Sequence, residues 1–140
     1  MSSVYLAETA QDIAACYPVM RQLRPHLSLD AFLQAVSELF NAGYQLAHLK
    51  QQEQVVAVAG FRFAQSLAWG RYLYVDDLIT DQAVRSQGHG KQLLHWLINE
   101  ARRHDCDQLH LDSGVQRKDA HRFYEREGMV FSSQHYAMLL

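Results

Sequence analysis

Between a predicted strand and a predicted amphipathic helix, the chain reads Arg85-Ser86-Gln87-Gly88-His89-Gly90-Lys91. The start of a helix leaves backbone N–H groups unpaired and carries partial positive charge, so it suits an anion. Gly88 and Gly90 allow the backbone to come close because they lack a Cβ, and Arg85 and Lys91 add positive charge at the edge. We therefore expect this turn to hold a diphosphate; a tight helix start without a ligand is the alternative.

Two common phosphate loops are excluded by the same residues. The P-loop has a glycine where this chain has Arg85, and a serine or threonine where it has Gln92. The dinucleotide fingerprint has a third glycine where this chain has Leu93. The pattern that remains is R-x-x-G-x-G.

Outward from this turn, the spacing of apolar residues switches between helical and strand-like. Helical spacing predicts helices over residues 10–23 with Thr9 as the N-cap, from Ser28 or Asp30 to about residue 41, over 88–104 and over 117–127. Apolar and alternating runs predict strands over residues 4–7, 44–50, 55–63, 71–80, 108–112, 129–132 and 135–140.

The resulting order, β-α-α-β-β-β-α-β-α-β-β, predicts an α/β fold of the mixed α+β kind. We expect one domain over residues 1–140, with a central mixed sheet of about six to seven strands flanked by about four helices. The β–α–β passage over residues 71–112 suggests a parallel pair inside the sheet. A chain of 140 residues, 49% of them hydrophobic and 20% charged, has the length and composition of one domain with one core.

Bulk properties argue against several functions. The net charge of -2 gives no general attraction to nucleic acid or to an anionic membrane. The N-terminus lacks a basic region followed by a long apolar run, so we expect no signal peptide and a cytoplasmic location. Cys16 and Cys106 favour two reduced thiols, with one disulfide left open. The eight histidines lack the spacing of a metal site, and we expect no metal.

Three segments in order resemble the GNAT superfamily of N-acetyltransferases: residues 77–80 (DLIT), the R-x-x-G-x-G turn, and residues 120–129 (AHRFYEREGM). The resemblance covers essentially the whole chain, because the order of elements also matches. It implies acetyl-CoA as donor and direct transfer of the acetyl group to a primary amine of a small molecule or peptide. It also implies that strand 76–80 diverges from strand 109–112 to admit the pantetheine arm. The cofactor-binding residues it implies are Leu78, Ile79, Thr80, Arg85, Ser86, Gln87, Gly88, His89, Gly90 and Lys91.

Tyr124 matches the family position whose hydroxyl reaches the coenzyme A sulfur, so the resemblance makes it the general acid to the departing thiolate. The alternative is that Phe123 and Tyr124 form an ordinary buried aromatic pair. The chain departs from the family at Arg117, where many members carry an asparagine that contacts the cofactor. We do not assign Arg117 the same contact, although its charge could approach the cofactor phosphates.

The general base is less defined. Asp76 or Asp77 is the tentative base, and as neighbours in a strand they should point to opposite faces of the sheet. A structural hydrogen-bonding or salt-bridge role for the pair is the alternative. His110, His121 and a bound water relayed by backbone carbonyls are further options for the base.

The acceptor amine is not identified by the sequence. Arg21, Arg24 and Arg71, with several aromatic residues, fall where the resemblance places the acceptor site, and would suit a small molecule with an apolar body and an acidic group. A non-catalytic acyl-CoA sensor is a second hypothesis, because it would keep the turn without needing Tyr124. A DNA-binding helix pair over residues 10–42 is disfavoured by the negative charge and by only two arginines in that segment. The oligomeric state stays open, with a homodimer as one option.

Overall fold

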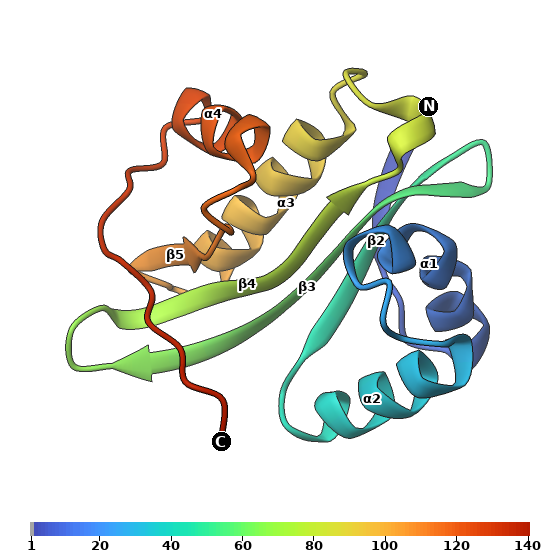
Figure 1. Ribbon diagram of the computed structural model, residues 1–140, viewed down its shortest axis with the longest axis horizontal. Coiled ribbons are helices and arrows are strands. Elements are labelled where there is room, and N and C mark those ends of the chain that lie inside the picture. Colours follow the sequence, from blue (N-terminus) through green and yellow to red (C-terminus); the bar gives the residue numbers. More distant parts are fainter. Residues whose placement is uncertain (1) are drawn as a thin grey trace. The chain divides into compact units, whose positions relative to one another are not determined.

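The computed structural model describes residues 2–140, and of Ser2 only the backbone. This part of the chain contains four helices, one short 3-10 turn and five strands, joined by loops (Figure 1). In chain order the elements are β1 (Ser2–Leu6), α1 (Ala10–Leu23), α2 (Leu29–Asn41), β2 (Gln45–Gln51), β3 (Gln54–Ser66), β4 (Gly70–Thr80), η1 (Gln82–Val84), α3 (His89–Arg103), β5 (Gln108–Leu111) and α4 (Lys118–Arg126). By its internal contacts the chain divides into a unit that ends at His110 and a second unit, Leu111–Leu140.

The strands form one sheet in the order β1-β2-β3-β4-β5. The first three neighbouring pairs are antiparallel. From β4 the chain crosses over by α3 and returns at β5, which lies next to β4 in the sheet. Such a helical crossover is the connection that joins parallel strands. The mixed sheet with its helices confirms the predicted fold class.

The predicted count of six to seven strands is wrong, because the sheet has five. Residues 129–140, predicted as two strands, are assigned to no strand within the described chain. Their large apolar side chains, including Phe131 and Tyr136, are exposed. An apolar run favours a strand only where a neighbour supplies ladder hydrogen bonds, and this segment is not part of the sheet.

One face of the sheet packs against α1 and α2. Thr9 and Ser28 start these helices, since the Thr9 hydroxyl accepts from the Asp12 amide and the Ser28 hydroxyl from the Ala31 amide, each at 3.1 Å. Ser28, and not Asp30, is therefore the N-cap of α2. The core on this face comprises Ala7, Ile13, Cys16, Val19, Met20, Phe32, Val36, Tyr44, Leu46, Val55, Val58 and Ile79.

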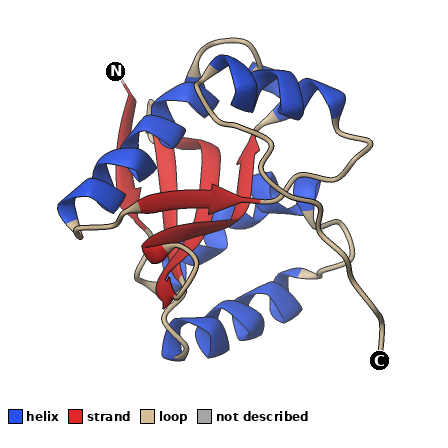
Figure 2. Ribbon diagram, turned by 90° about the vertical axis from the view of Figure 1, so that its left-hand side faces the viewer, coloured by secondary structure: helices blue, strands red, loops and turns tan. Residues whose placement is uncertain are grey.

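The opposite face of the sheet packs against α3, so helices lie on both sides of the strands (Figure 2). Phe61 of β3 meets Trp96 of α3 edge to face, with ring centroids 5.8 Å apart. Strand alternation puts the fully buried Ala57 and Ala59 on the same side as Phe61. These small side chains leave room for the buried leucines of α3, which are Leu93, Leu94 and Leu97.

Truncating one of these leucines tests the packing. Leu97 is fully buried, so Leu97→Ala should lower the free energy of unfolding by about 2–5 kcal/mol, through lost apolar burial and a residual cavity. Leu39→Ala is the matched control, because Leu39 is 44% exposed on α2 and should change stability by less than about 0.5 kcal/mol. Urea titration followed by circular dichroism measures both. Equal effects of the two substitutions would contradict the assigned core.

Candidate active site

The turn before α3 is built to leave backbone amides open. Gly88 is the N-cap of α3 in the left-handed conformation, with φ +84°, and no side chain caps the helix. A Cβ placed on Gly88 would meet no atom within 4 Å, so open space lies beside this position. Ser86 also has a positive φ, of 65°. An uncapped helix start facing open space fits an anionic group such as a diphosphate.

The predicted residues of this turn do not all present side chains to that space. Arg85, Ser86, Gln87 and Lys91 are exposed. In contrast, the His89 side chain is only 4% exposed, and its Nε2 has no hydrogen-bond partner in the described chain. Any contribution of His89 to a bound anion therefore comes from its backbone amide.

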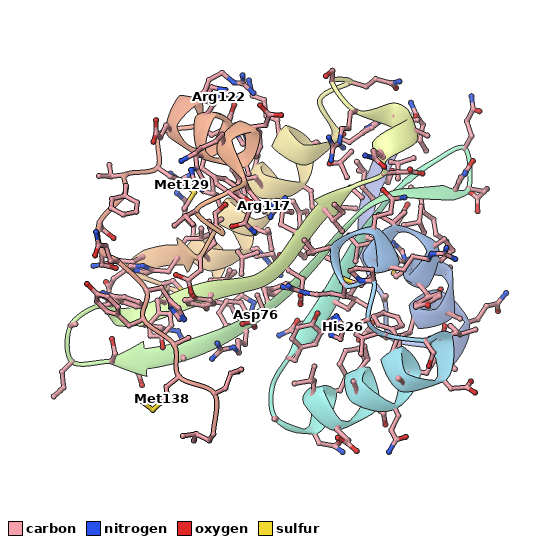
Figure 3. The ribbon with its side chains drawn as sticks, viewed as in Figure 1. His26, Asp76, Arg117, Arg122, Met129 and Met138 are labelled. Carbon is pink, nitrogen blue, oxygen red and sulfur yellow. The ribbon has the colours of Figure 1, made fainter. Side chains whose placement is uncertain are left out.

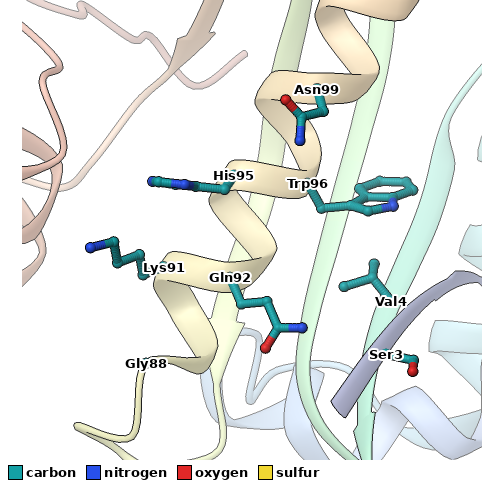
Figure 4. A pocket seen from close by; sticks show the side chains of 8 residues that line it. All are labelled: Ser3, Val4, Gly88, Lys91, Gln92, His95, Trp96 and Asn99. Atoms are coloured by element: carbon teal, nitrogen blue, oxygen red, sulfur yellow. The ribbon is translucent and has the colours of Figure 1, made fainter. Parts of the chain in front are cut away.

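A pocket of about 630 Å³ begins at this turn and follows α3 toward β1 (Figure 4). Lys91 and Gln92 lie near its Gly88 end, and Trp96 points toward β1. The residues that line it are Ser3, Val4, Gly88, Lys91, Gln92, His95, Trp96 and Asn99. Gly88 therefore lies at one end of this pocket.

Helix α1 anchors the connection between β4 and the turn. The Gln22 side chain accepts from the Gln82 amide at 2.9 Å and donates to Asp81 Oδ1 at 3.1 Å. The same Asp81 oxygen accepts from the Ala83 amide, which starts η1. These bonds fix the path of the chain between the end of β4 and Arg85.

One edge of β4 pairs with β3, and β5 covers only part of the other edge. β4 has 11 residues and β5 has 4. The two strands begin together, because the Asp107 amide donates to the Arg71 carbonyl at 2.6 Å. The far part of β4, which contains Leu78, Ile79 and Thr80, extends beyond the end of β5 at Leu111. Backbone groups on that edge are available to a ligand that lies along the strand.

A β-bulge lies just before that open part of β4. Gly60 pairs with Asp77 and Phe61 pairs with Val75, so Asp76 is an extra residue in β4. Asp76 lies midway along the strand (Figure 3). The bulge changes the alternation of side chains, with direct consequences for the two aspartates.

The prediction that Asp76 and Asp77 point to opposite faces is wrong because of this bulge. Both carboxylates lie on the α1 and α2 side of the sheet, each in an ion pair. Arg62 binds Asp76 through two hydrogen bonds, of 2.8 and 3.1 Å. Arg24 Nε donates to Asp77 Oδ1 at 2.9 Å, and the Tyr44 hydroxyl donates to Asp77 Oδ2 at 2.7 Å.

These pairings also remove charge from the expected acceptor site. Arg24 is held by Asp77, and Arg71 Nε donates to the His104 carbonyl at 2.7 Å. Two of the three arginines expected to face an acidic acceptor group are therefore engaged within the protein. The expected preference for an acidic acceptor loses its main support.

Tyr124 lies on α4 in the second unit, where its ring contacts Phe123 with centroids 5.4 Å apart. It is half-buried. Burial raises the pKa of its phenol, and the nearby Arg117 charge only partly opposes that rise. The hydroxyl is therefore protonated at neutral pH and is a hydrogen-bond donor. Gly128, with φ +95°, follows the C-cap of α4 at Glu127.

Three residues of this region were not recognised as site residues from the sequence: Gln22, Tyr44 and Gly60. Gln22 is one polar residue among several on α1, and Tyr44 falls at the start of a predicted strand. A glycine inside a strand indicates a bulge or a close approach of another group. Gly60 is therefore the only one of the three whose role could have been suspected from the sequence. A Cβ on Gly60 would lie 1.7 Å from Tyr44 Oη.

Neither cysteine is placed as a nucleophile. Both are free thiols. Burial, with a smaller effect of the Asp12 charge, raises the pKa of Cys16 to about 12. Burial also raises the pKa of Cys106, which is less enclosed. Within residues 2–140 we find no cluster of three or more metal-ligating side chains, and none of the helices has the length and apolar character to cross a membrane.

Comparison with known proteins gives a consistent result. Residues 6–129 match the acetyltransferase (GNAT) family. An uncharacterised N-acetyltransferase, YhdJ of Bacillus subtilis, is 35% identical over 125 residues, which cover 88% of each chain. The aminoalkylphosphonate N-acetyltransferase of Salmonella typhimurium is 41% identical over 54 residues, or 39% of this chain and 35% of that protein.

A solved structure shares the fold. The aminoglycoside N-acetyltransferase AAC(6')-Iy, solved in complex with CoA, superposes with a TM-score of 0.86 over 100% of this chain and 95% of that one. Its sequence is 12% identical, so the likeness concerns the fold alone.

Thiol labelling tests the environment of the cysteines. Because a raised pKa keeps Cys16 protonated and burial blocks access, Cys16 should resist Ellman's reagent at pH 8 in the folded protein, whereas Cys106 should react. Unfolding in guanidinium chloride should release the second thiol. Cys16→Ser and Cys106→Ser, each labelled separately, assign the two phases. Fast labelling of folded Cys106→Ser protein would contradict the buried position of Cys16.

Proposed function

This chain belongs to the acetyltransferase (GNAT) family, and we propose that it transfers an acetyl group from acetyl-CoA directly to a primary amine of a small molecule or peptide. The observation that carries the proposal is the uncapped start of α3, where Gly88 faces open space. Family membership supports acetyl-CoA as the donor. The raised pKa of both cysteine thiols argues against an acyl-enzyme step at either of them, which supports direct transfer.

We propose that acetyl-CoA is held along β4 and across the turn. Backbone N–H groups at the start of α3 would bind the diphosphate, with Arg85 and Lys91 adding charge at the rim. The open edge of β4 would hold the pantetheine arm by strand-like hydrogen bonds. The proposed binding residues are Leu78, Ile79, Thr80, Arg85, Ser86, Gln87, Gly88, His89, Gly90 and Lys91.

The chemistry requires proton transfers at the amine nitrogen and at the sulfur. An amine with a lysine-like pKa near ~10.4 is mostly protonated at neutral pH, so a base must take its proton before the nitrogen attacks the thioester carbon. We propose a carboxylate of the Asp76 and Asp77 pair as that base. The Asp76 side chain is the more accessible, at 28% exposed against 15% for Asp77. Backbone N–H groups of residues 78–80 are the proposed donors to the carbonyl oxygen.

As the C–N bond forms, the C–S bond breaks and its electron pair leaves on sulfur. We propose that Tyr124 donates its hydroxyl proton to that sulfur. The raised pKa of Tyr124 keeps the proton on the phenol before transfer. The nitrogen loses two protons in becoming the amide: the base takes the first before the attack, and the second, released as the C–S bond breaks, restores the proton that Tyr124 gives to the sulfur.

The acceptor is proposed only as a primary amine. The acceptor in the name of the Salmonella relative, an aminoalkylphosphonate, is a small amine, which supports a small-molecule acceptor. Arg24 is in an ion pair with Asp77, and Arg71 donates a hydrogen bond to the His104 carbonyl. These contacts argue against recognition of an acidic group of the acceptor by either arginine.

Coenzyme A binding tests the proposed donor site. Isothermal titration should show saturable binding of CoA, and Arg85→Ala or Lys91→Ala should each weaken it by about 0.5–1 kcal/mol, roughly 2- to 5-fold, as exposed charges do. Arg102→Ala is the control, because Arg102 is exposed at the opposite end of α3. Absence of saturable binding would contradict the donor site, while binding without thiol release on a broad amine panel would favour an acyl-CoA sensor.

Tyr124→Phe tests the proposed acid. Removing the hydroxyl should lower kcat by about 100-fold, in the range of general acid catalysis, and leave the Kd for CoA unchanged. Because its pKa is raised, Tyr124 itself should cause no loss of wild-type activity at any pH below the ordinary tyrosine value near ~10. Free thiol release measures the rates. Tyr5→Phe, on the exposed side of β1, is the control; a kcat of Tyr124→Phe equal to that of this control would remove Tyr124 from the mechanism.

A further inference from the structure

Arg24 binds both the side chain and the backbone of the β4 bulge. Its Nε donates to Asp77 Oδ1 at 2.9 Å, and its Nη2 donates to the Asp76 carbonyl at 3.0 Å. Asp76 is the extra residue of the bulge, so one guanidinium at the C-cap of α1 bridges the irregular part of the strand. Arginine suits this role because its donors lie in one rigid plane.

Tyr44 binds the second oxygen of the Asp77 carboxylate. Its hydroxyl donates to Asp77 Oδ2 at 2.7 Å, and its side chain is buried at 7% exposure. Burial first, and then the negative charge of Asp77, raise the pKa of Tyr44 well above its ordinary value. Tyr44 therefore keeps its proton and remains a donor. Each oxygen of Asp77 thus has a donor from the protein.

Gly60 makes this arrangement possible. It pairs with Asp77 across β3 and β4. A Cβ at this position would lie 1.7 Å from Tyr44 Oη and 2.6 Å from Asp77 Oδ2, so a larger residue would displace one of them. The sequence carries glycine at the one place where Tyr44 and Asp77 need the space to meet.

The position of this cluster along β4 suggests what it does. Asp77 directly precedes Leu78, Ile79 and Thr80, whose backbone is the proposed binding edge for the thioester. Both oxygens of its carboxylate already accept hydrogen bonds from the protein, Oδ1 from Arg24 and Oδ2 from Tyr44. The contacts of Asp77 with Arg24 and Tyr44 hold the backbone of β4 in place at this point.

We propose that Arg24, Tyr44 and Asp77 form a clamp that positions the backbone of residues 76–80 for acetyl transfer, and that Asp77 is a positioning residue. This inference rests on the proposed function, because residues 78–80 matter for rate only if they hold the thioester. Asp76, the more exposed carboxylate of the pair, remains the proposed base, and it would have to leave its ion pair with Arg62 to accept the proton.

The kinetic test compares Arg24→Gln, Tyr44→Phe, Asp77→Asn and Asp77→Ala. Loosening the clamp should lower kcat by about 10- to 100-fold in Arg24→Gln and Asp77→Ala, since small displacements of reacting groups have effects of that size. Asp77→Asn keeps the shape and hydrogen-bonding capacity of the side chain, so it should retain more activity than Asp77→Ala. The double variant Arg24→Gln/Asp77→Ala should be little worse than either single one, because both remove the same contact.

The dependence of kcat/KM on pH separates a clamp from a base. If Asp77 only positions the strand, the acidic limb of the profile should persist in Asp77→Asn. If Asp77 is the base, Asp77→Asn should be as inactive as Asp77→Ala and should lose that limb. Wild-type kcat in both Arg24→Gln and Tyr44→Phe would equally overturn the clamp.

Hydrogen exchange provides a readout that does not depend on turnover. Arg24→Gln, Tyr44→Phe and Asp77→Ala should each speed amide exchange in residues 76–80, while exchange in α3 stays at the wild-type rate. Arg103→Gln is the control, because it removes an arginine–carboxylate pair with Glu100, also of 2.9 Å, at the far end of α3. Unchanged exchange in residues 76–80 would overturn the clamp. If the wild-type protein instead fails to bind CoA, the proposed function is overturned, but the exchange measurement still tests the clamp. Tyr44→Phe, which removes a single oxygen, serves if Asp77→Ala does not fold.

Discussion

The contact between the Arg24 guanidinium and the bulge at Asp76 determines how the rest of the candidate site is laid out. Without the extra residue, alternation from Val75 would turn Asp77 toward α3, into the apolar layer that contains Phe61. With it, both aspartates face the α1 side, where arginines neutralise them. Leu78, the partner of Ala59, returns to the α3 side. The bulge therefore lets one strand carry two charges in its middle without burying either of them unpaired.

The end of α1 connects the two parts that the proposed donor site requires. Gln22 and Arg24 are two residues apart, and they hold the turn after β4 and the bulge within β4, respectively. The strand and the turn before α3 are thus fixed to the same short piece of helix. The spacing between the proposed pantetheine edge and the proposed diphosphate turn is set by this shared support as well as by the chain that joins them.

The sequence predicted the elements that depend on local rules, and missed features that depend on a partner. Thr9, Ser28 and Gly88 mark helix starts because capping is local. The bulge at Asp76 has no signature within β4 itself, since it exists only in the register with β3, where Gly60 is the one sign of it. The same reason explains residues 129–140: their apolar pattern fits a strand, but a strand needs a neighbour that the pattern does not specify. Of the candidate site, the turn could be predicted from its glycines, while the pairing of Asp77 with Arg24 could not.

The two anchors supplied by α1 differ in kind, and this difference has a consequence for solution conditions. Gln22 carries no charge and holds the turn through hydrogen bonds with the Gln82 amide and the Asp81 carboxylate, whereas Arg24 holds the bulge through an ion pair whose arginine is 40% exposed. Mobile ions weaken interactions between accessible charges and leave neutral hydrogen bonds nearly unaffected. Ionic strength should therefore act selectively on the middle of β4, next to the proposed thioester edge, while the turn before α3, the proposed diphosphate site, keeps its shape.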